Sequence, residues 1–156
     1  PLLQSSAASD VYKRQVGPYM MLKEAQSYLL ESSNPSVVNV GSIAGVTGIG
    51  SSIAYASSKG ALLNMTKSLA RALGPIRVNA ICPGFIQGDW LRNGLGDEVY
   101  EMVKEATEKS TPLKLTVTAD QVADSIIYFV EDAVTTTGET LLLDGGMHLG
   151  GPVPLK

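Results

Sequence analysis

The chain has 156 residues, of which 44% are hydrophobic and 17% are charged, and its formal net charge is -3. This composition allows a packed core and argues against a nucleic-acid surface, which needs a strongly basic patch. No apolar run approaches the ~20 residues that cross a bilayer, and a single Cys excludes an intramolecular disulfide. We therefore expect a soluble, cytoplasmic α/β protein without nucleic-acid or membrane partners.

Residues 1–15 differ in character from the rest of the chain. They show neither helical nor alternating apolar periodicity, and the pattern changes abruptly at Val16. They resemble tails seen at the ends of assembled sequencing reads, so we interpret them as non-native, with a disordered native leader as the alternative. Residues 16–150 are expected to form one domain, followed by a tail at 151–156.

Helices and buried strands alternate from residue 16 onwards. The predicted helices are 16–31, one from Tyr55 to about Leu73, 97–109 and 118–129, and the predicted strands are 37–40, 76–81 and 137–143. Segments 41–50 and 88–94 are rich in Gly and are predicted as loops. In helix 118–129 we expect four residues to pack inward: Val122, Ile126, Ile127 and Val130. This alternation predicts an α/β fold with a parallel sheet.

Tyr55, Lys59 and Ser42 are the residues that best indicate chemistry. Tyr55 and Lys59 are four positions apart on a predicted helix, so they share one face. A neighbouring ammonium favours the ionised phenol, which can then exchange a proton near neutral pH. Ser42 follows strand 37–40, at the sheet edge where open α/β folds bind ligands. A Tyr and Lys at this spacing are common by chance, so the combination with Ser42 gives the pattern its weight.

Four motifs in a fixed order carry a resemblance to a known family. They are Val-Asn-Val-Gly-Ser-Ile-Ala-Gly at 38–45, Tyr-Ala-Ser-Ser-Lys at 55–59, Arg-Val-Asn-Ala-Ile-Cys-Pro-Gly at 77–84 and Gly-Glu-Thr-Leu-Leu-Leu-Asp-Gly-Gly at 138–146. Over residues 16–150 the chain resembles the short-chain dehydrogenase/reductase family. The resemblance implies a Rossmann-like, doubly wound parallel sheet and hydride exchange between NAD or NADP and a secondary alcohol or ketone, a 3-oxoacyl thioester being one example.

The resemblance also implies roles for individual residues. Ser42 would hold the substrate oxygen, Tyr55 would pass the proton, and Lys59 would assist Tyr55 and bond the nicotinamide ribose. Three further residues would line the cofactor: Pro83, Gly84 and Ile86. The weaker candidates for the substrate pocket are Trp90, Leu91, Tyr100 and Met102. Arg92 is a candidate to meet an anionic substrate tail, with a solvated surface role as the alternative, and the family implies a homodimer or homotetramer.

The chain departs from the family pattern in three respects, one of which is Gly88, where the family often has a Thr that bonds the cofactor. It has no Gly-rich phosphate loop and no acidic residue placed to bind the adenosine ribose, so we expect the second half of the fold and leave the choice between NAD and NADP open. Arg14 stands where the family usually has an Asn that holds a water of the proton relay. An inactive fragment and a non-catalytic interaction subunit are therefore alternatives to an enzyme. The sequence contains no metal-ligand cluster, and Cys82 is expected to be a buried small hydrophobe.

Overall fold

A computed structural model describes residues 12–150. The predictions for residues 1–11 and 151–156 lie outside this described range. The described chain forms a three-stranded parallel sheet in the order β1-β2-β3, with β1 at Ser36–Val40, β2 at Arg77–Pro83 and β3 at Thr140–Leu143. Every residue of β2 is buried, because this strand lies between the other two and is covered on both faces.

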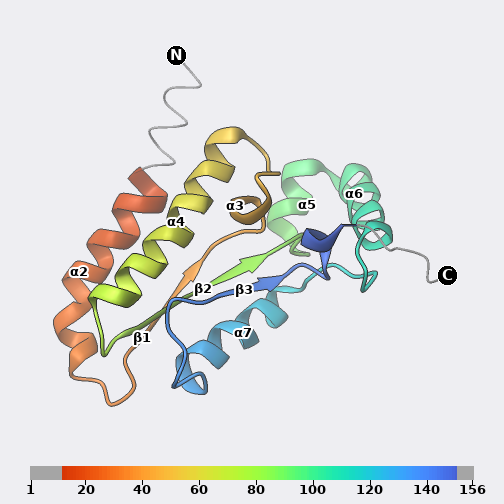
Figure 1. Ribbon diagram of the computed structural model, residues 1–156. Helices are drawn as coiled ribbons and strands as arrows, with labels where there is room; N and C mark the ends of the chain where they lie inside the picture. The colour runs from red at the N-terminus through yellow and green to blue at the C-terminus, as the bar shows by residue number, and fades with distance from the viewer. Residues whose placement is uncertain (1–11, 151–156) are drawn as a thin grey trace.

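Helical segments connect and flank the strands. In chain order they are η1 (Tyr12–Val16), α2 (Gly17–Leu30), α3 (Ala44–Thr47), α4 (Ile53–Ala72), α5 (Asp89–Leu95), α6 (Asp97–Ser110), α7 (Ala119–Glu131) and η2 (Met147–Leu149). In Figure 1, α2 and α4 lie on one side of the sheet and α7 lies on the other. The predicted doubly wound parallel arrangement is thus confirmed.

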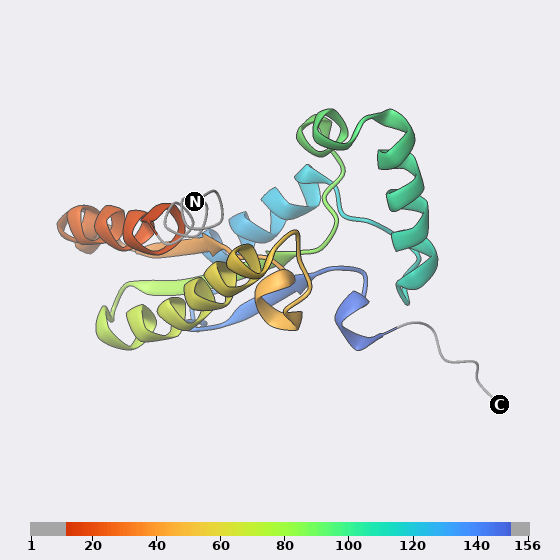
Figure 2. The same ribbon diagram turned by 90° about the horizontal axis from the view of Figure 1, so that it is seen from above.

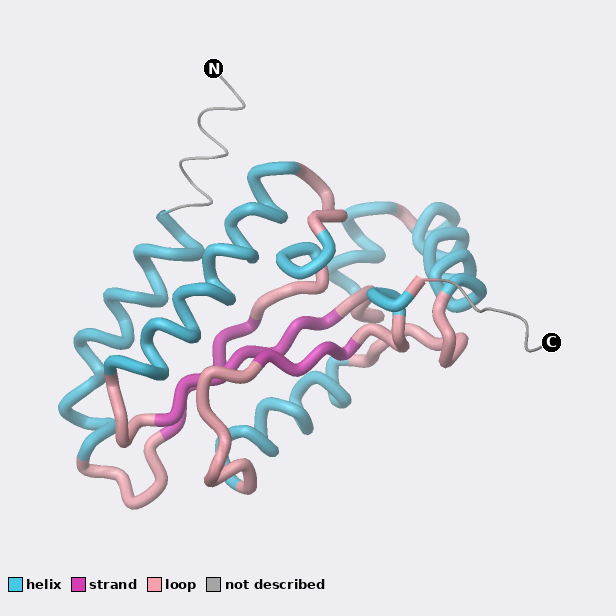
Figure 3. Tube along the Cα trace, in the orientation of Figure 1, coloured by secondary structure: helices cyan, strands magenta, loops and turns pink. Residues whose placement is uncertain are grey.

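The helices α5 and α6 lie apart from these layers. Figures 2 and 3 show both of them beyond the carboxyl ends of the strands, on the chain segment that leaves β2. The main core lies instead under α7, where Ile81 of β2 packs with Val117, Val122, Phe129 and Ala133. The sheet and its covering helices therefore form the main packed body, and α5 and α6 lie beside the carboxyl ends of its strands.

Local sequence signals explain where two helices begin. The Ser52 side chain accepts a hydrogen bond from the Tyr55 backbone amide at 3.1 Å and caps α4. Thr118 and Gln121 form a reciprocal capping box at the start of α7. Ser and Thr at such positions satisfy amide groups that have no partner within the helix. The first cap fixes the start of α4 immediately before the predicted proton donor.

Three predictions about local structure are wrong. Segment 41–50 is not entirely a loop, because Ala44–Thr47 form the short helix α3. Segment 88–94 is not a loop: residues Asp89–Leu95 form α5, because helical hydrogen bonds close between Gly88 and Arg92 and between Arg92 and Gly96 despite the glycines. In α7 the inward face includes Phe129, which is 3% exposed, whereas Ile127 and Val130 face solvent. Val122, Ile126 and Phe129 follow the three- and four-residue spacing of one helix face, and the other two residues do not.

β3 is shorter than predicted at its start, since it begins at Thr140 rather than at residue 137. The preceding residues still contact β2: the Val78 amide donates to the Thr137 hydroxyl at 3.0 Å, and the Gly138 amide donates to the Val78 carbonyl at 2.8 Å. A side chain thus replaces one backbone partner of the ladder.

The apolar residues of α2 are mostly uncovered in the described chain. Leu22 is buried, but Met21 and Tyr28 are each 75% exposed. Val40 at the end of β1 is also 45% exposed, on a strand that pairs within residues 12–150 only with β2. The β1 side of the molecule therefore presents apolar surface that the described part of the chain does not cover.

Arg77 joins three parts of the fold at the start of β2. Its side chain is buried, with Nη1 donating to the carbonyls of Phe129 at 2.6 Å and Ala133 at 3.0 Å. Nη2 donates to Asn34 Oδ1 and to the Val130 carbonyl, both at 2.9 Å. These carbonyls lie at and just beyond the C-terminal end of α7, where helical backbone groups need outside partners. The guanidinium satisfies them and ties α7 to the entry of β1.

We predict that Arg77→Met lowers the free energy of unfolding by about 3 kcal/mol, because it removes four hydrogen bonds that a buried guanidinium donates. Urea denaturation followed by circular dichroism measures this change. Arg71→Met, at an exposed position near the end of α4, is the control and should stay within about 0.5 kcal/mol of the original chain. Equal effects of the two substitutions would show that the Arg77 contacts do not stabilise the fold.

Candidate active site

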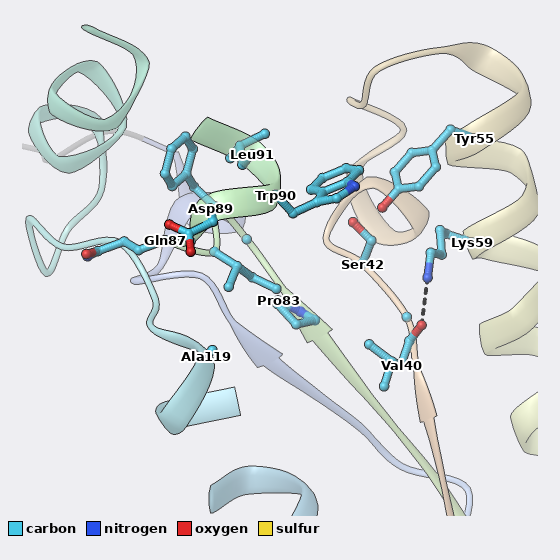
Figure 4. A pocket seen from close by; sticks show the side chains of 15 residues that line it. Val40, Ser42, Tyr55, Lys59, Pro83, Gln87, Asp89, Trp90, Leu91 and Ala119 are labelled. Atoms are coloured by element: carbon cyan, nitrogen blue, oxygen red, sulfur yellow. Dashed lines mark hydrogen bonds between the residues drawn. The ribbon is translucent and has the colours of Figure 1, made fainter. Parts of the chain in front are cut away.

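A cavity of ≈ 520 Å³ opens at the carboxyl ends of β1 and β2 (Figure 4). It brings together eight of the residues selected from the sequence: Ser42, Tyr55, Lys59, Pro83, Gly84, Ile86, Trp90 and Leu91. The remaining described lining residues are Val40, Gly41, Phe85, Gln87, Gly88, Asp89 and Ala119. Side chains from β1, α4 and the segment after β2 thus converge although they are far apart in sequence.

Ser42 is placed by the pairing of β1 with β2. The Gly41 amide donates to the Ile81 carbonyl at 2.7 Å, so the chain remains held to β2 one residue before the serine. Ser42 Oγ accepts a hydrogen bond from the Ala44 amide at 3.2 Å, and the residue is 9% exposed. Figure 4 shows the Ser42 and Tyr55 hydroxyl groups directed toward the same region of the cavity. The serine O–H remains available to donate to a ligand there.

Lys59 lies one helical turn after Tyr55 on α4. Its Nζ is 6.0 Å from the centre of the Tyr55 ring and donates a hydrogen bond to the Val40 carbonyl at 2.7 Å. Burial lowers the pKa of Lys59 below its ordinary value, the Arg14 charge adds to this, and Cys82 opposes it. The ammonium group is therefore beside the phenol but anchored to the end of β1.

Gly45 brings the Ser42 segment against α4. A Cβ at this position would lie 2.6 Å from the Lys59 carbonyl carbon and 2.7 Å from the Gly60 amide nitrogen. Gly60 also faces this contact, less closely, since a Cβ there would lie 3.3 Å from the Gly45 carbonyl oxygen. Distances below 3.0 Å to backbone atoms leave no room for a side chain. This contact fixes the distance between the helix that carries Tyr55 and the segment that carries Ser42.

Arg14 also lies at the site. Its guanidinium carbon is 5.1 Å from the centre of the Tyr55 ring, within the range of a cation–π contact. The neighbouring Gln15 side chain donates to the Ser58 carbonyl at 2.7 Å and holds η1 against α4. The sequence identifies Arg14 as a departure from the family pattern, and the structure places its positive charge on the proposed proton donor.

The segment after β2 forms the opposite wall. Ile86 forms a parallel bridge with Val117, in which the Gln87 amide donates to the Val117 carbonyl at 2.8 Å and the Val117 amide donates to the Phe85 carbonyl at 3.0 Å. In this pattern the amide and carbonyl of Ile86 itself point away from Val117. The cavity lining therefore includes a backbone donor and acceptor side by side, a pair that matches a carboxamide group.

Tyr100 and Met102 are not among the lining residues of this cavity. Tyr100 is 2% exposed and its ring packs 5.5 Å from that of Phe85, behind the cavity wall. Met102 is 62% exposed on α6 and lines a separate hollow near Met147. Conversely, Gln87 and Asp89 line the cavity but were not predicted from the sequence. Their position close to Gly84 and Ile86 could have indicated that they line the cavity. The prediction of a loop at 88–94 drew attention away from this possibility.

Other chemistries receive no support from residues 12–150. Cys82 is fully buried, and burial raises the pKa of its thiol, so it has the expected character of a core residue rather than a nucleophile. Over the same described residues, no cluster of His, Cys, Asp and Glu forms a potential metal site. None of the helices described here has the length and apolar character required to span a bilayer.

Comparison with known proteins identifies the family. The family model described as enoyl-(acyl carrier protein) reductase matches residues 11–148. The short-chain dehydrogenase/reductase homolog YusR of Bacillus subtilis is 36% identical over 134 residues, which cover 85% of this chain and 98% of that protein. The chain belongs to the short-chain dehydrogenase/reductase family.

Other relatives are longer than this chain. Ketoacyl reductase 2 of the granaticin polyketide synthase of Streptomyces violaceoruber is 41% identical over 135 residues, covering 86% of this chain and 53% of that protein. The solved structure of 4-hydroxyisoleucine dehydrogenase complexed with NADH superposes with a TM-score of 0.74 at 29% identity, covering 88% of this chain and 57% of that one. The chain thus spans about half of these two relatives and nearly all of the Bacillus protein.

We predict that Gly45→Ala lowers the free energy of unfolding by about 2 kcal/mol, because the added methyl group must displace the Lys59–Gly60 backbone. Thermal denaturation followed by circular dichroism measures the effect. Gly94→Ala in α5 is the control: its Cβ would meet no atom within 4 Å, and it should be neutral or stabilise by about 0.5–1 kcal/mol through helix propensity. A Gly45 variant as stable as the Gly94 variant would contradict the close contact.

Proposed function

We propose that the protein carrying this chain is an NAD(P)(H)-dependent oxidoreductase that interconverts a secondary alcohol and a ketone. The observation that supports this proposal most directly is the single cavity lined by Ser42, Tyr55 and Lys59 in a chain of this family. Ser42 donates its O–H to the substrate oxygen, which holds and polarises the carbonyl. Tyr55 gives that oxygen a proton as negative charge develops on it, and the nearby ammonium of Lys59 stabilises the resulting phenolate.

The same cavity suits a nicotinamide cofactor. The outward-facing amide and carbonyl of Ile86 match the nicotinamide carboxamide, and Pro83 and Gly84 line the adjoining wall. Tyr55 and Lys59 would bond the ribose from the α4 side. The cofactor, when bound, supplies or accepts the hydride. We leave NAD and NADP as equal alternatives, since the residues that bind the adenosine end were not found in the sequence.

The substrate is proposed to be a small carbonyl compound. A 3-oxoacyl thioester is one example, supported by the ketoacyl reductase among the relatives. Trp90 and Leu91 line the cavity and are proposed as its substrate side. We further propose that residues 16–150 are the C-terminal part of one Rossmann-like domain, that residues 1–15 are a non-native or disordered leader, and that residues 151–156 are a tail.

Two properties of the surroundings complete the proposal. The exposed apolar face of α2, where Met21 and Tyr28 are each 75% exposed, supports a homodimer or homotetramer in the parent protein. We also propose a cytoplasmic location, from the acidic composition and the lone buried Cys.

Tyr55→Phe is expected to reduce turnover at least about 100-fold, because the phenol that transfers the proton is lost while the ring remains. Turnover is measured by NADH and NADPH absorbance with a panel of ketones, in the longest protein that carries this chain. Tyr128→Phe on α7, at a residue that is 49% exposed and outside the described cavity lining, is the matched control and should leave turnover unchanged. Near-normal activity of the Tyr55 variant on the best substrate would refute the assignment.

A second candidate is that this chain alone is a catalytically inactive fragment or a non-catalytic interaction subunit. The observation that favours it is the uncovered apolar surface on the β1 side of residues 12–150, at Val40 and along α2. Calorimetric titration of the purified chain with NADH and NADPH separates the candidates. Saturable binding by the original chain that weakens in Lys59→Met supports the oxidoreductase, and the absence of binding supports the fragment.

A further inference from the structure

The charges that face the cavity are unevenly distributed. Among its described lining residues the charged side chains are Lys59 and Asp89. Lys59 Nζ is held by the Val40 carbonyl at 2.7 Å, on the α4 side where the reacting groups lie. Asp89 is the first residue of α5 and lies on the other side of the cavity in Figure 4. The part of the cavity remote from Ser42 and Tyr55 therefore carries a negative charge.

Arg92 does not offset this negative charge. Its guanidinium donates to Asp97 Oδ1 at 2.9 Å and to Glu101 Oε1 at 2.7 Å, and it lies 4.2 Å above the Tyr100 ring. Arg92, which the sequence suggested could bind an anionic substrate tail, is thus already in contact with two carboxylates and an aromatic ring. Arg92 is also absent from the described cavity lining.

The other two cations of segment 89–110 are paired as well. Lys104 contacts Glu108 at 2.9 Å, and Lys109 contacts Glu105 at 2.6 Å. Segment 89–110 contains six acidic and three basic residues, so the field near the cavity mouth is negative. A ligand tail that bears a carboxylate or a phosphate would meet repulsion on this side.

Trp90 provides a flat apolar surface next to Asp89. Its side chain lines the cavity yet the residue is 87% exposed, and Figure 4 shows the indole on the side of the cavity that faces Ser42 and Tyr55. An indole face attracts cations and stacks on planar groups. A carboxylate on the adjacent residue adds a partner for a cation or a hydrogen-bond donor.

We propose that the substrate of this site is a carbonyl compound with a flat apolar tail that ends in a cation or a hydrogen-bond donor. The Trp90 indole contacts the tail, Asp89 binds its end, and tails that end in a carboxylate or a phosphate are disfavoured. This inference rests on the proposed function, because it takes Ser42 and Tyr55 as the groups that bind the carbonyl oxygen. It goes beyond that function by assigning the substrate class and the residues that select it.

Trp90 is the only tryptophan in the sequence, so its fluorescence reports directly on this cavity. The chain is titrated with three acetophenones that differ only at the para position: aminomethyl, hydroxymethyl and carboxylate. We expect the dissociation constant of the aminomethyl compound to be about threefold below that of the hydroxymethyl compound and that of the carboxylate about threefold above it, as for a partly solvated ion pair. Calorimetry on the same samples gives a second measurement that does not depend on the indole.

Asp89→Asn tests the source of the discrimination. In this variant the three dissociation constants should agree within about twofold, since the charge is removed and the shape is kept. Glu98→Gln on α6, outside the described cavity lining, is the matched control and should keep the original order. Ser42→Ala should weaken all three ketones alike, which separates the carbonyl end from the tail.

Three outcomes would overturn the inference: carboxylate binding as tight as aminomethyl binding, an unchanged order in Asp89→Asn, or no saturable binding of the aminomethyl compound up to about 10 mM. The proposed function is judged separately, by NADH and NADPH titration and by Tyr55→Phe. If the ketones bind in the expected order but neither cofactor binds, the substrate inference stands and the oxidoreductase proposal for this chain fails. If a cofactor binds but the ketones do not follow the expected order, the oxidoreductase proposal stands and the inference about the substrate tail fails.

Discussion

The close contact between Gly45 and the Lys59–Gly60 backbone is the constraint on which the candidate site depends. Ser42 belongs to the segment that continues β1, whereas Tyr55 and Lys59 belong to α4. Hydrogen bonds of the sheet fix the first segment, and the Ser52 cap fixes the start of the second. Neither of these sets the separation of the two segments. Their separation is set by the contact between the Gly45 and Lys59–Gly60 backbones, which leaves no room for a Cβ. Such a contact fixes the distance more precisely than packing between flexible side chains.

β2 links this site to the stability of the whole molecule. Arg77, at the start of β2, binds carbonyls at the end of α7. Asn79, two residues further along the strand, donates to the Thr136 carbonyl at 2.9 Å and accepts from the Glu139 amide at 3.0 Å. Both side chains are buried and fully used, so they specify how α7 and the entry to β3 lie against the strand. The other end of β2 delivers Pro83 to the cavity. Polar groups inside one strand therefore orient the wall that would receive the cofactor.

The sequence predicted the residues at the centre of the cavity better than those at its borders. Ser42, Tyr55 and Lys59 follow from spacing and strand position, since parallel strands bring their carboxyl ends to one edge and a helix brings residues i and i+4 together. α5 was not predicted because Gly88 and Gly94 have low helix propensity, and tertiary context overrides a weak local preference. The prediction that Tyr100 and Met102 line the pocket rested on the family resemblance, which implies that this stretch of chain closes over the substrate. The orientation of α6 decides whether the Tyr100 ring lines the cavity or packs behind its wall. No local sequence pattern encodes that orientation.

This difference has a structural origin that bears on specificity. The reacting groups lie on elements held by the sheet and by a backbone contact, whereas the substrate wall lies on α5, which leaves β2 through Gly88 and ends at Gly96, a residue with φ of 79°. α5 contacts α6 through the Arg92 ion pairs and lies outside the main core. Substitutions on α5 can therefore change the charge and shape of the substrate wall without moving Ser42 or Tyr55. In the proposed enzyme, the groups assigned to the reaction lie beside the sheet and on α4, and the residues assigned to substrate selection lie on α5.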